Sequence, residues 1–120
     1  MQITVTGRHV EITDAMRDHA HQRIQGALMD FPRIESVHVI LAVEKYRHFA
    51  EIVIQAPNHI RVDAREESND MYASIDLAVD KAVKQMRRHW EKMRDHKARE
   101  GLSQLELEAE SAEGRSGVAP

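Results

Sequence analysis

The chain contains no cysteine, and only 4% of its 120 residues are aromatic. The lack of cysteine excludes a disulfide framework and thiolate chemistry. The scarcity of aromatic residues is unfavourable for a surface on which nucleic-acid bases stack. No apolar run approaches the roughly 20 residues of a membrane span, and no basic segment precedes an apolar one at the start of the chain. These absences predict a soluble, intracellular protein with no signal peptide and no membrane partner.

Motifs of catalysis and cofactor binding are also missing. The sequence shows no glycine-rich phosphate loop, nucleophile elbow or catalytic triad. Its eight histidines lack the spacing of metal ligands: His19 and His21 point in different directions on an expected helix, and no acidic ligand lies suitably between His89 and His96. We therefore expect no metal, no cofactor and no small-molecule substrate.

One pair of carboxylates could serve as acid–base or metal-binding groups. Asp76 and Asp80 are one helical turn apart, a spacing that paired catalytic carboxylates can use. However, both lie near the expected N-terminal end of a helix, where anions are favourable. Lys84 also follows Asp80 by four residues, the spacing of a helical ion pair. We expect a structural role for both, no catalytic residues and no enzymatic activity.

Hydrophobic periodicity predicts one α+β domain with the element order β-α-β-β-β-α. Ile3 and Val5 indicate a short strand that ends at Gly7, and Thr13 is a good N-cap for a helix that Pro32 would stop. Three alternating patterns then predict an antiparallel sheet covered on one side, over residues 37–44, 50–55 and 60–65. The two helices should pack on one face of the four-stranded sheet. Residues 1–99 form this domain, and residues 100–120 form an acidic tail that we expect to be disordered.

The last predicted helix, residues 70–99, has faces of opposite chemistry. An apolar stripe with helical spacing predicts its buried side; its members are Tyr72, Ile75, Val79, Ala82, Val83, Met86, Trp90 and Met93. The rotation of about 100° per residue places a row of cations on the opposite side; these are Lys81, Lys84, Arg88, Lys92 and Arg99, flanked by Arg87, Arg94 and Lys97. Gly101 is the expected end of the helix.

The net charge of −3 conceals a strong asymmetry along the chain. Residues 1–80 hold 8 Lys or Arg and 13 Asp or Glu, whereas residues 81–99 hold 8 basic and 2 acidic residues. Residues 100–120 hold 1 Arg and 5 Glu. A short positive segment between negative flanks is consistent either with a polyanionic partner or with an ordinary solvated helix face.

Three stretches resemble the ribosome hibernation-promoting factor family, which includes the ribosome-associated translation inhibitor. They are ITVTG with VEIT near the start, Lys45 with His48 and the following strand, and DMYASID at 70–76 continuing into the basic helix. The resemblance spans about residues 1–98 and implies the same β-α-β-β-β-α fold. The chain resembles short members, which lack the extra C-terminal domain of long ones. Gly26 departs from the pattern, because relatives often carry Lys or Arg there.

The resemblance implies a cytoplasmic, ribosome-associated inhibitor of translation. Such a protein binds the rRNA of the small subunit, beside neighbouring ribosomal proteins, in the channel of messenger and transfer RNA, and keeps ribosomes idle in stationary phase or stress. Matching of basic positions implies RNA contacts for Arg23, Lys45, Lys81, Lys84, Arg88 and Lys92, to which charge and position add Arg47 and Arg87.

Two other functions stay open from the residues alone. A general module for structured RNA could use the same basic helix. A protein–protein adaptor could instead dock a partner on the open sheet face or on the acidic tail.

Overall fold

The computed structural model describes the backbone of residues 1–113 and the side chains of residues 1–94. The elements are β1 (Gln2–Arg8), α1 (Asp14–Leu28), β2 (Ser36–Glu44), β3 (Arg47–Ala56), β4 (Ile60–Ser68) and α2 (Met71–Glu113). This is the predicted order β-α-β-β-β-α, and the predicted α+β fold is confirmed. The chain divides into two units, residues 1–86 and 87–120. The predicted domain boundary between residues 99 and 100 stays a prediction.

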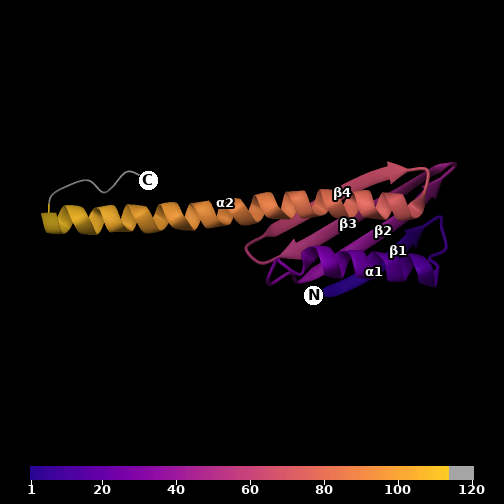
Figure 1. Ribbon diagram of the computed structural model, residues 1–120, viewed down its shortest axis with the longest axis horizontal. Coiled ribbons are helices and arrows are strands. Elements are labelled where there is room, and N and C mark those ends of the chain that lie inside the picture. The colour runs from indigo at the N-terminus through magenta and orange to yellow at the C-terminus, as the bar shows by residue number, and fades with distance from the viewer. Residues whose placement is uncertain (114–120) are drawn as a thin grey trace. The chain divides into compact units, whose positions relative to one another are not determined.

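The sheet has the strand order β1-β2-β3-β4 and is mixed (Figure 1). β2, β3 and β4 pair antiparallel, as the alternating patterns predicted. β1 instead pairs parallel with β2, with Ile3 opposite Val37. The parallel pairing follows from the connection, because α1 carries the chain back across the sheet between the two strands.

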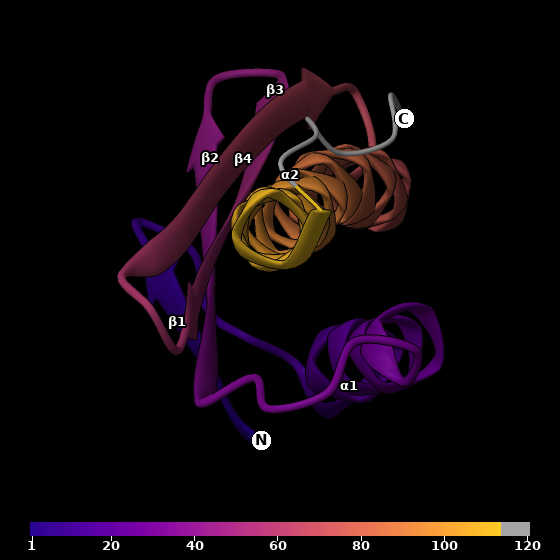
Figure 2. The ribbon, with the colours of Figure 1, turned by 90° about the vertical axis from the view of Figure 1, so that its left-hand side faces the viewer.

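Within residues 1–86, both helices cover the same face of the sheet (Figure 2). The covered face supplies one side of the core through the predicted alternating residues, among them Val37, Val39, Ile52 and Val62, all at most 1% exposed. α1 contributes Ala20, Ile24 and Leu28, and α2 contributes Met71, Ile75, Ala78, Val79, Ala82 and Met86. No helix lies against the other face of the sheet in this unit.

Short-range capping fixes where both helices begin. Thr13 accepts a hydrogen bond from the backbone N–H of Met16 at 3.1 Å, as the sequence predicted. Asp70 accepts one from the backbone N–H of Ala73 at 3.0 Å. Each contact satisfies a donor that the first helical turn leaves open. α1 ends at Leu28, so Pro32 lies beyond the helix end rather than at it.

Three local expectations are wrong. β1 continues through Gly7 to Arg8; glycine is needed there because a Cβ would lie 2.5 Å from the carbonyl oxygen of Val10. α2 continues through Gly101 to Glu113, since strong helix formers on both sides offset the cost of about 1 kcal/mol for one internal glycine. Tyr72, expected on the buried stripe, is 37% exposed. The part of the expected disordered tail at residues 114–120 lies outside the described residues.

Candidate nucleic-acid interface

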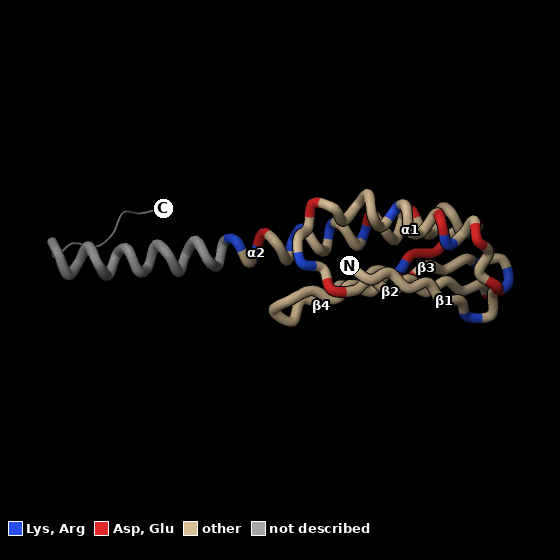
Figure 3. The backbone as a smooth tube through the Cα atoms, turned by 90° about the horizontal axis from the view of Figure 1, so that it is seen from below, with Lys and Arg blue, Asp and Glu red and all other residues tan. Residues whose placement is uncertain are grey.

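Two of the predicted RNA-binding residues lie on the exposed side of α2 within residues 1–86. Ala82 and Met86 are buried, whereas Lys81 and Lys84 are exposed. The alternation reproduces the predicted opposition of apolar and cationic faces. Figure 3 marks the basic and acidic positions along the backbone.

Lys84 and Lys81 differ in their surroundings. Among the side chains of residues 1–94, no carboxylate lies within ion-pair distance of Lys84. The Nζ of Lys81 donates to the carbonyl oxygen of Arg65 at 3.2 Å and lies 3.5 Å from a carboxylate oxygen of Glu66. Lys84 is therefore the cation of this pair that can approach a phosphate without first leaving a partner.

Arg47 is held by a carboxylate across the β3–β4 pair. Its guanidinium donates from Nε to Glu67 at 2.6 Å and from a terminal nitrogen to the other carboxylate oxygen at 2.9 Å. This two-bond contact and the positive charge hold the pKa of the Glu67 carboxyl below its ordinary value, and the same contact raises the pKa of Arg47. Both side chains are largely exposed, so water screens the attraction.

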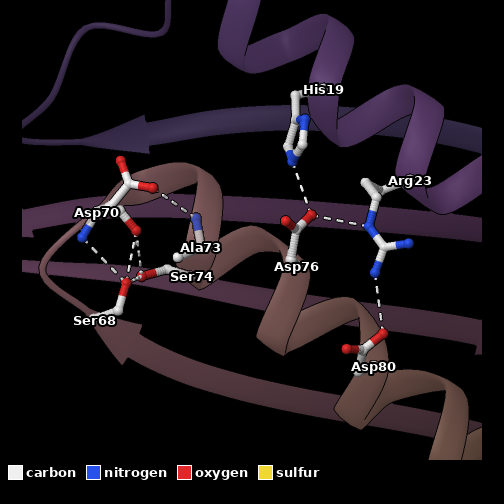
Figure 4. Close-up of polar contacts among 8 residues, drawn as sticks. All are labelled: His19, Arg23, Ser68, Asp70, Ala73, Ser74, Asp76 and Asp80. Atoms are coloured by element: carbon white, nitrogen blue, oxygen red, sulfur yellow. Dashed lines mark hydrogen bonds and ion pairs between the residues drawn. The ribbon is translucent and has the colours of Figure 1, made fainter.

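Arg23 is the most heavily paired of the predicted residues. It extends from α1 to two carboxylates on α2, with Nε 2.9 Å from Asp76 Oδ1 and a terminal nitrogen 3.0 Å from Asp80 Oδ1 (Figure 4). His19 Nε2 lies 2.8 Å from the same oxygen of Asp76. The expected pairing of Asp80 with Lys84 is not formed, because α1 brings the forked guanidinium into range of both carboxylates. The two aspartates thus connect the helices, in accord with a structural role.

Lys45 lies in the turn between β2 and β3. The turn consists of Lys45 and Tyr46, because Glu44 pairs directly with Arg47. Lys45 has a φ of 57°, in the left-handed region that residues with a Cβ rarely adopt. Both turn residues are exposed. The hairpin therefore presents one cation at its tip in a fixed, strained backbone conformation.

The remaining predicted residues belong to the unit of residues 87–120. Arg87, Arg88 and Lys92 are all exposed on α2, and Arg94 is exposed as well. Trp90 and Met93 are half-buried, on the side that the apolar stripe predicted. The side chains of Lys97 and Arg99 lie outside the described residues, so their place on the basic row stays a prediction.

Neither a metal-binding cluster nor a membrane-spanning helix occurs among the described residues. Within them, no group of three His, Cys, Asp or Glu is arranged to hold a metal. No helix over the same residues combines the length and apolar character needed to cross a bilayer.

Arg65 is a basic residue that the sequence analysis did not select. It lies on β4 with its guanidinium over the ring of Phe49, 4.7 Å from the ring centroid. The alternation of β4 could have indicated that Arg65 is exposed, because Arg61, Asp63 and Arg65 fall on the polar face of the strand. The partner strand that supplies Phe49 could not be identified without the register, so the stacked pair was not predicted.

Comparisons with known proteins agree with this architecture. Residues 3–94 match the family model described as Sigma 54 modulation protein / S30EA ribosomal protein. A ribosome hibernation promoting factor of Salmonella typhimurium is 38% identical over 96 residues, which are 80% of this chain and all of that protein. The N-terminal domain of Protein Y from Thermus thermophilus is 34% identical with a TM-score of 0.67, covering 74% of this chain and 99% of that one. A ribosomal subunit interface protein of Coxiella burnetii has a TM-score of 0.70 at 26% identity, covering 74% and 97%. The chain therefore belongs to the Sigma 54 modulation protein / S30EA ribosomal protein family, as its resemblance to hibernation factors indicated.

Proposed function

We propose that this protein is a non-catalytic ribosome hibernation factor of the cytoplasm. It binds the rRNA of the small ribosomal subunit, beside neighbouring ribosomal proteins, in the channel that messenger and transfer RNA would occupy. Inhibition is steric, and it keeps ribosomes idle in stationary phase or stress. Membership of a family with relatives named hibernation promoting factors supports the ribosomal partner.

The observation that carries the RNA-binding mode is the exposure of cations on α2. Lys84 in the first unit, and Arg87, Arg88 and Lys92 in the second, are exposed on the helix while Ala82 and Met86 are buried. Exposed lysines and arginines bind phosphates and release counterions, and such binding needs no base-specific contact. We assign the main phosphate contacts to these residues and to Lys45 at the hairpin tip.

Arg23, Arg47 and Lys81 contribute in a different way. Each already contacts a carboxylate of this chain, so a phosphate must replace that carboxylate or share the cation with it. Their contribution to affinity is therefore smaller than that of an unpaired cation.

Charge reversal tests the proposal with a matched control. The variant Lys84→Glu with Arg88→Glu should lose cosedimentation with small ribosomal subunits. The control Arg33→Glu with Arg61→Glu makes the same change in net charge at exposed positions outside α2, and it should still cosediment. Wild-type binding should weaken with salt by a log–log slope of about −0.7 to −0.9 per neutralised phosphate. Retained binding by the Lys84 and Arg88 variant would contradict the assigned surface.

Two further measurements separate the proposed function from the alternatives. A sucrose gradient of stationary-phase ribosomes should contain this protein with the small subunit. Free RNA duplexes that compete as well as ribosomes would instead indicate a general RNA-binding module, and salt-insensitive binding to a protein would indicate an adaptor.

A further inference from the structure

A cavity of about 410 Å³ lies at the edge of the sheet, beside β4 and the adjacent part of α2. It is lined by Arg47, Phe49, Arg65, Glu66, Glu67 and Lys81. The three cations and two carboxylates in this lining give the cavity a net charge of one positive unit. All six residues belong to the unit of residues 1–86.

Phe49 is the apolar floor of this cavity. Ala50 and Ile52, one and three residues further along β3, face the core, so the alternation of the strand places Phe49 on the uncovered face of the sheet. It is nevertheless only 8% exposed, because two guanidinium groups cover its ring. The Cζ of Arg47 lies 5.1 Å from the ring centroid, and that of Arg65 lies 4.7 Å from it.

The two stacked arginines are not equivalent. Arg47 uses its N–H groups on the Glu67 carboxylate, and Lys81 lies near Glu66. For the side chain of Arg65, the described residues supply neither a hydrogen bond nor an ion pair. A guanidinium that stacks through its flat face keeps its edge donors available. The net charge of the cavity therefore resides on a side chain that the Phe49 ring restrains and whose donors have no partner among the described residues.

We propose that this cavity binds a phosphate group of the RNA backbone, with Arg65 as its principal ligand and Lys81 as the second. Arg65 donates from its edge while it stays on Phe49, and Lys81 turns a free N–H toward the same oxygens. Little side-chain entropy is lost, because stacking already restrains Arg65. The inference rests on the proposed function and adds to it a contact at the sheet edge, which shares only Lys81 with the exposed row of α2.

A substitution of Arg65 tests the cavity against a matched position on the same strand. Arg65→Met removes the charge and keeps a long side chain over Phe49. Arg61→Met makes the same change on β4 at a position over which none of the described aromatic rings is stacked. With full-length chains and purified small ribosomal subunits, Arg65→Met should weaken binding by about five- to tenfold at 0.1 M salt and reduce the log–log salt slope by about 0.7 to 0.9, one phosphate contact. Arg61→Met should change neither.

Equal affinities and equal salt slopes for Arg65→Met and Arg61→Met would overturn the cavity as a phosphate site. The proposed function would still stand in that case, provided that the wild-type chain binds the subunits. A wild-type chain that fails to bind subunits would overturn the proposed function, and a second measurement then decides the cavity. Inorganic phosphate should shift the Nε–H resonance of Arg65 in the wild-type chain, and chloride at equal ionic strength should not. Equal responses to both anions would overturn the site. If Arg65→Met does not fold, the same titration of the wild-type chain tests the cavity in its place.

Discussion

Arg23 on α1 and Asp76 on α2 are joined by a hydrogen bond of 2.9 Å between guanidinium Nε and carboxylate Oδ1. The same guanidinium reaches Asp80 at 3.0 Å, and His19 lies 2.8 Å from the shared oxygen of Asp76. A residue that family resemblance implied as an RNA ligand therefore also connects the two helices of the domain.

Substitution at this contact should affect stability more than binding. The side chains of Arg23 and Asp76 are 37% and 43% exposed, so water screens the pair and its coupling energy should be about 0.5–1 kcal/mol. Chemical denaturation of Arg23→Ala, Asp76→Ala and the double variant measures this coupling. Arg23→Ala should reduce affinity for small subunits less than Lys84→Ala does. A larger loss for Arg23→Ala would make Arg23 a direct ligand.

Features that depend on residues close together in the sequence could be predicted, whereas features that depend on residues far apart in the sequence could not. The N-cap at Thr13 and the alternation of buried residues such as Ile52 and Val62 each depend on nearby residues, so the element order and the buried faces could be predicted. Exposure of Lys81 and Lys84 followed from the helical period in the same way.

Contacts between elements were missed because they depend on packing and register. The partner of Asp80 was expected at Lys84 on the same helix, but Arg23 competes from α1, 57 residues away in sequence. Arg47 reaches Glu67 only through the β3–β4 pairing, which places Glu67 opposite Phe49, two residues along β3 from Arg47. Sequence reasoning therefore identified the cations of α2 up to Arg94 correctly as exposed. It could not say which cations the protein's own carboxylates pair with, and Arg23, expected on an exposed side of its helix, is half-buried.

At the tip of the β2–β3 hairpin, Lys45→Gly should change stability and binding in opposite directions. Lys45 has a φ of 57°, which glycine adopts without a steric cost. Removing that cost should stabilise the fold by about 0.5–1 kcal/mol, after allowance for the greater freedom of glycine in the unfolded chain. The loss of one exposed cation should weaken binding to small subunits at low salt.

Lys45→Gln is the control for this variant, because it removes the charge and keeps the backbone strain. It should bind as weakly as Lys45→Gly and gain no stability. Thermal unfolding and cosedimentation at several salt concentrations measure the two effects. If both variants bind like the wild type, Lys45 does not contact RNA.

The stability of the protein should depend on pH through the carboxyl of Glu51 on β3. Its pKa is raised, first by a hydrogen bond with Asp63, then by partial burial and the negative charge of Asp63, against smaller opposing effects of Arg65 and Arg8. A group with a raised pKa in the folded state favours folding while protonated, and that contribution is lost as the pH rises through the folded pKa. Glu51→Gln, whose amide can still donate to Asp63, should therefore be more stable than the wild type at pH 7.

The advantage of Glu51→Gln should shrink as the pH falls and vanish below the ordinary glutamate pKa of about 4.3. Urea unfolding between pH 3 and 7 measures it. Asp63→Asn should return the pKa of Glu51 toward its ordinary value, which NMR titration of the side-chain carboxyl can follow. An advantage that increases toward acid would contradict the assigned cause.

Gly26 near the C-terminal end of α1 offers a test of binding by added charge. A Cβ built at Gly26 meets nothing within 4 Å, and the last turn of α1 holds no basic residue. Gly26→Ala should therefore stabilise the protein by about 0.8–1 kcal/mol through helix propensity alone. Gly26→Lys should stabilise it by a similar amount, with a further 0.3–1 kcal/mol or so from the favourable position of a cation at the helix end.

The two variants separate helix stability from RNA contact. If α1 faces rRNA, Gly26→Lys should bind small subunits more tightly than Gly26→Ala and steepen the log–log salt slope by about 0.7 to 0.9. Gly26→Ala should bind like the wild type, since it adds no charge. Cosedimentation across a salt series measures both, and an identical slope for the two variants would place this end of α1 away from the RNA.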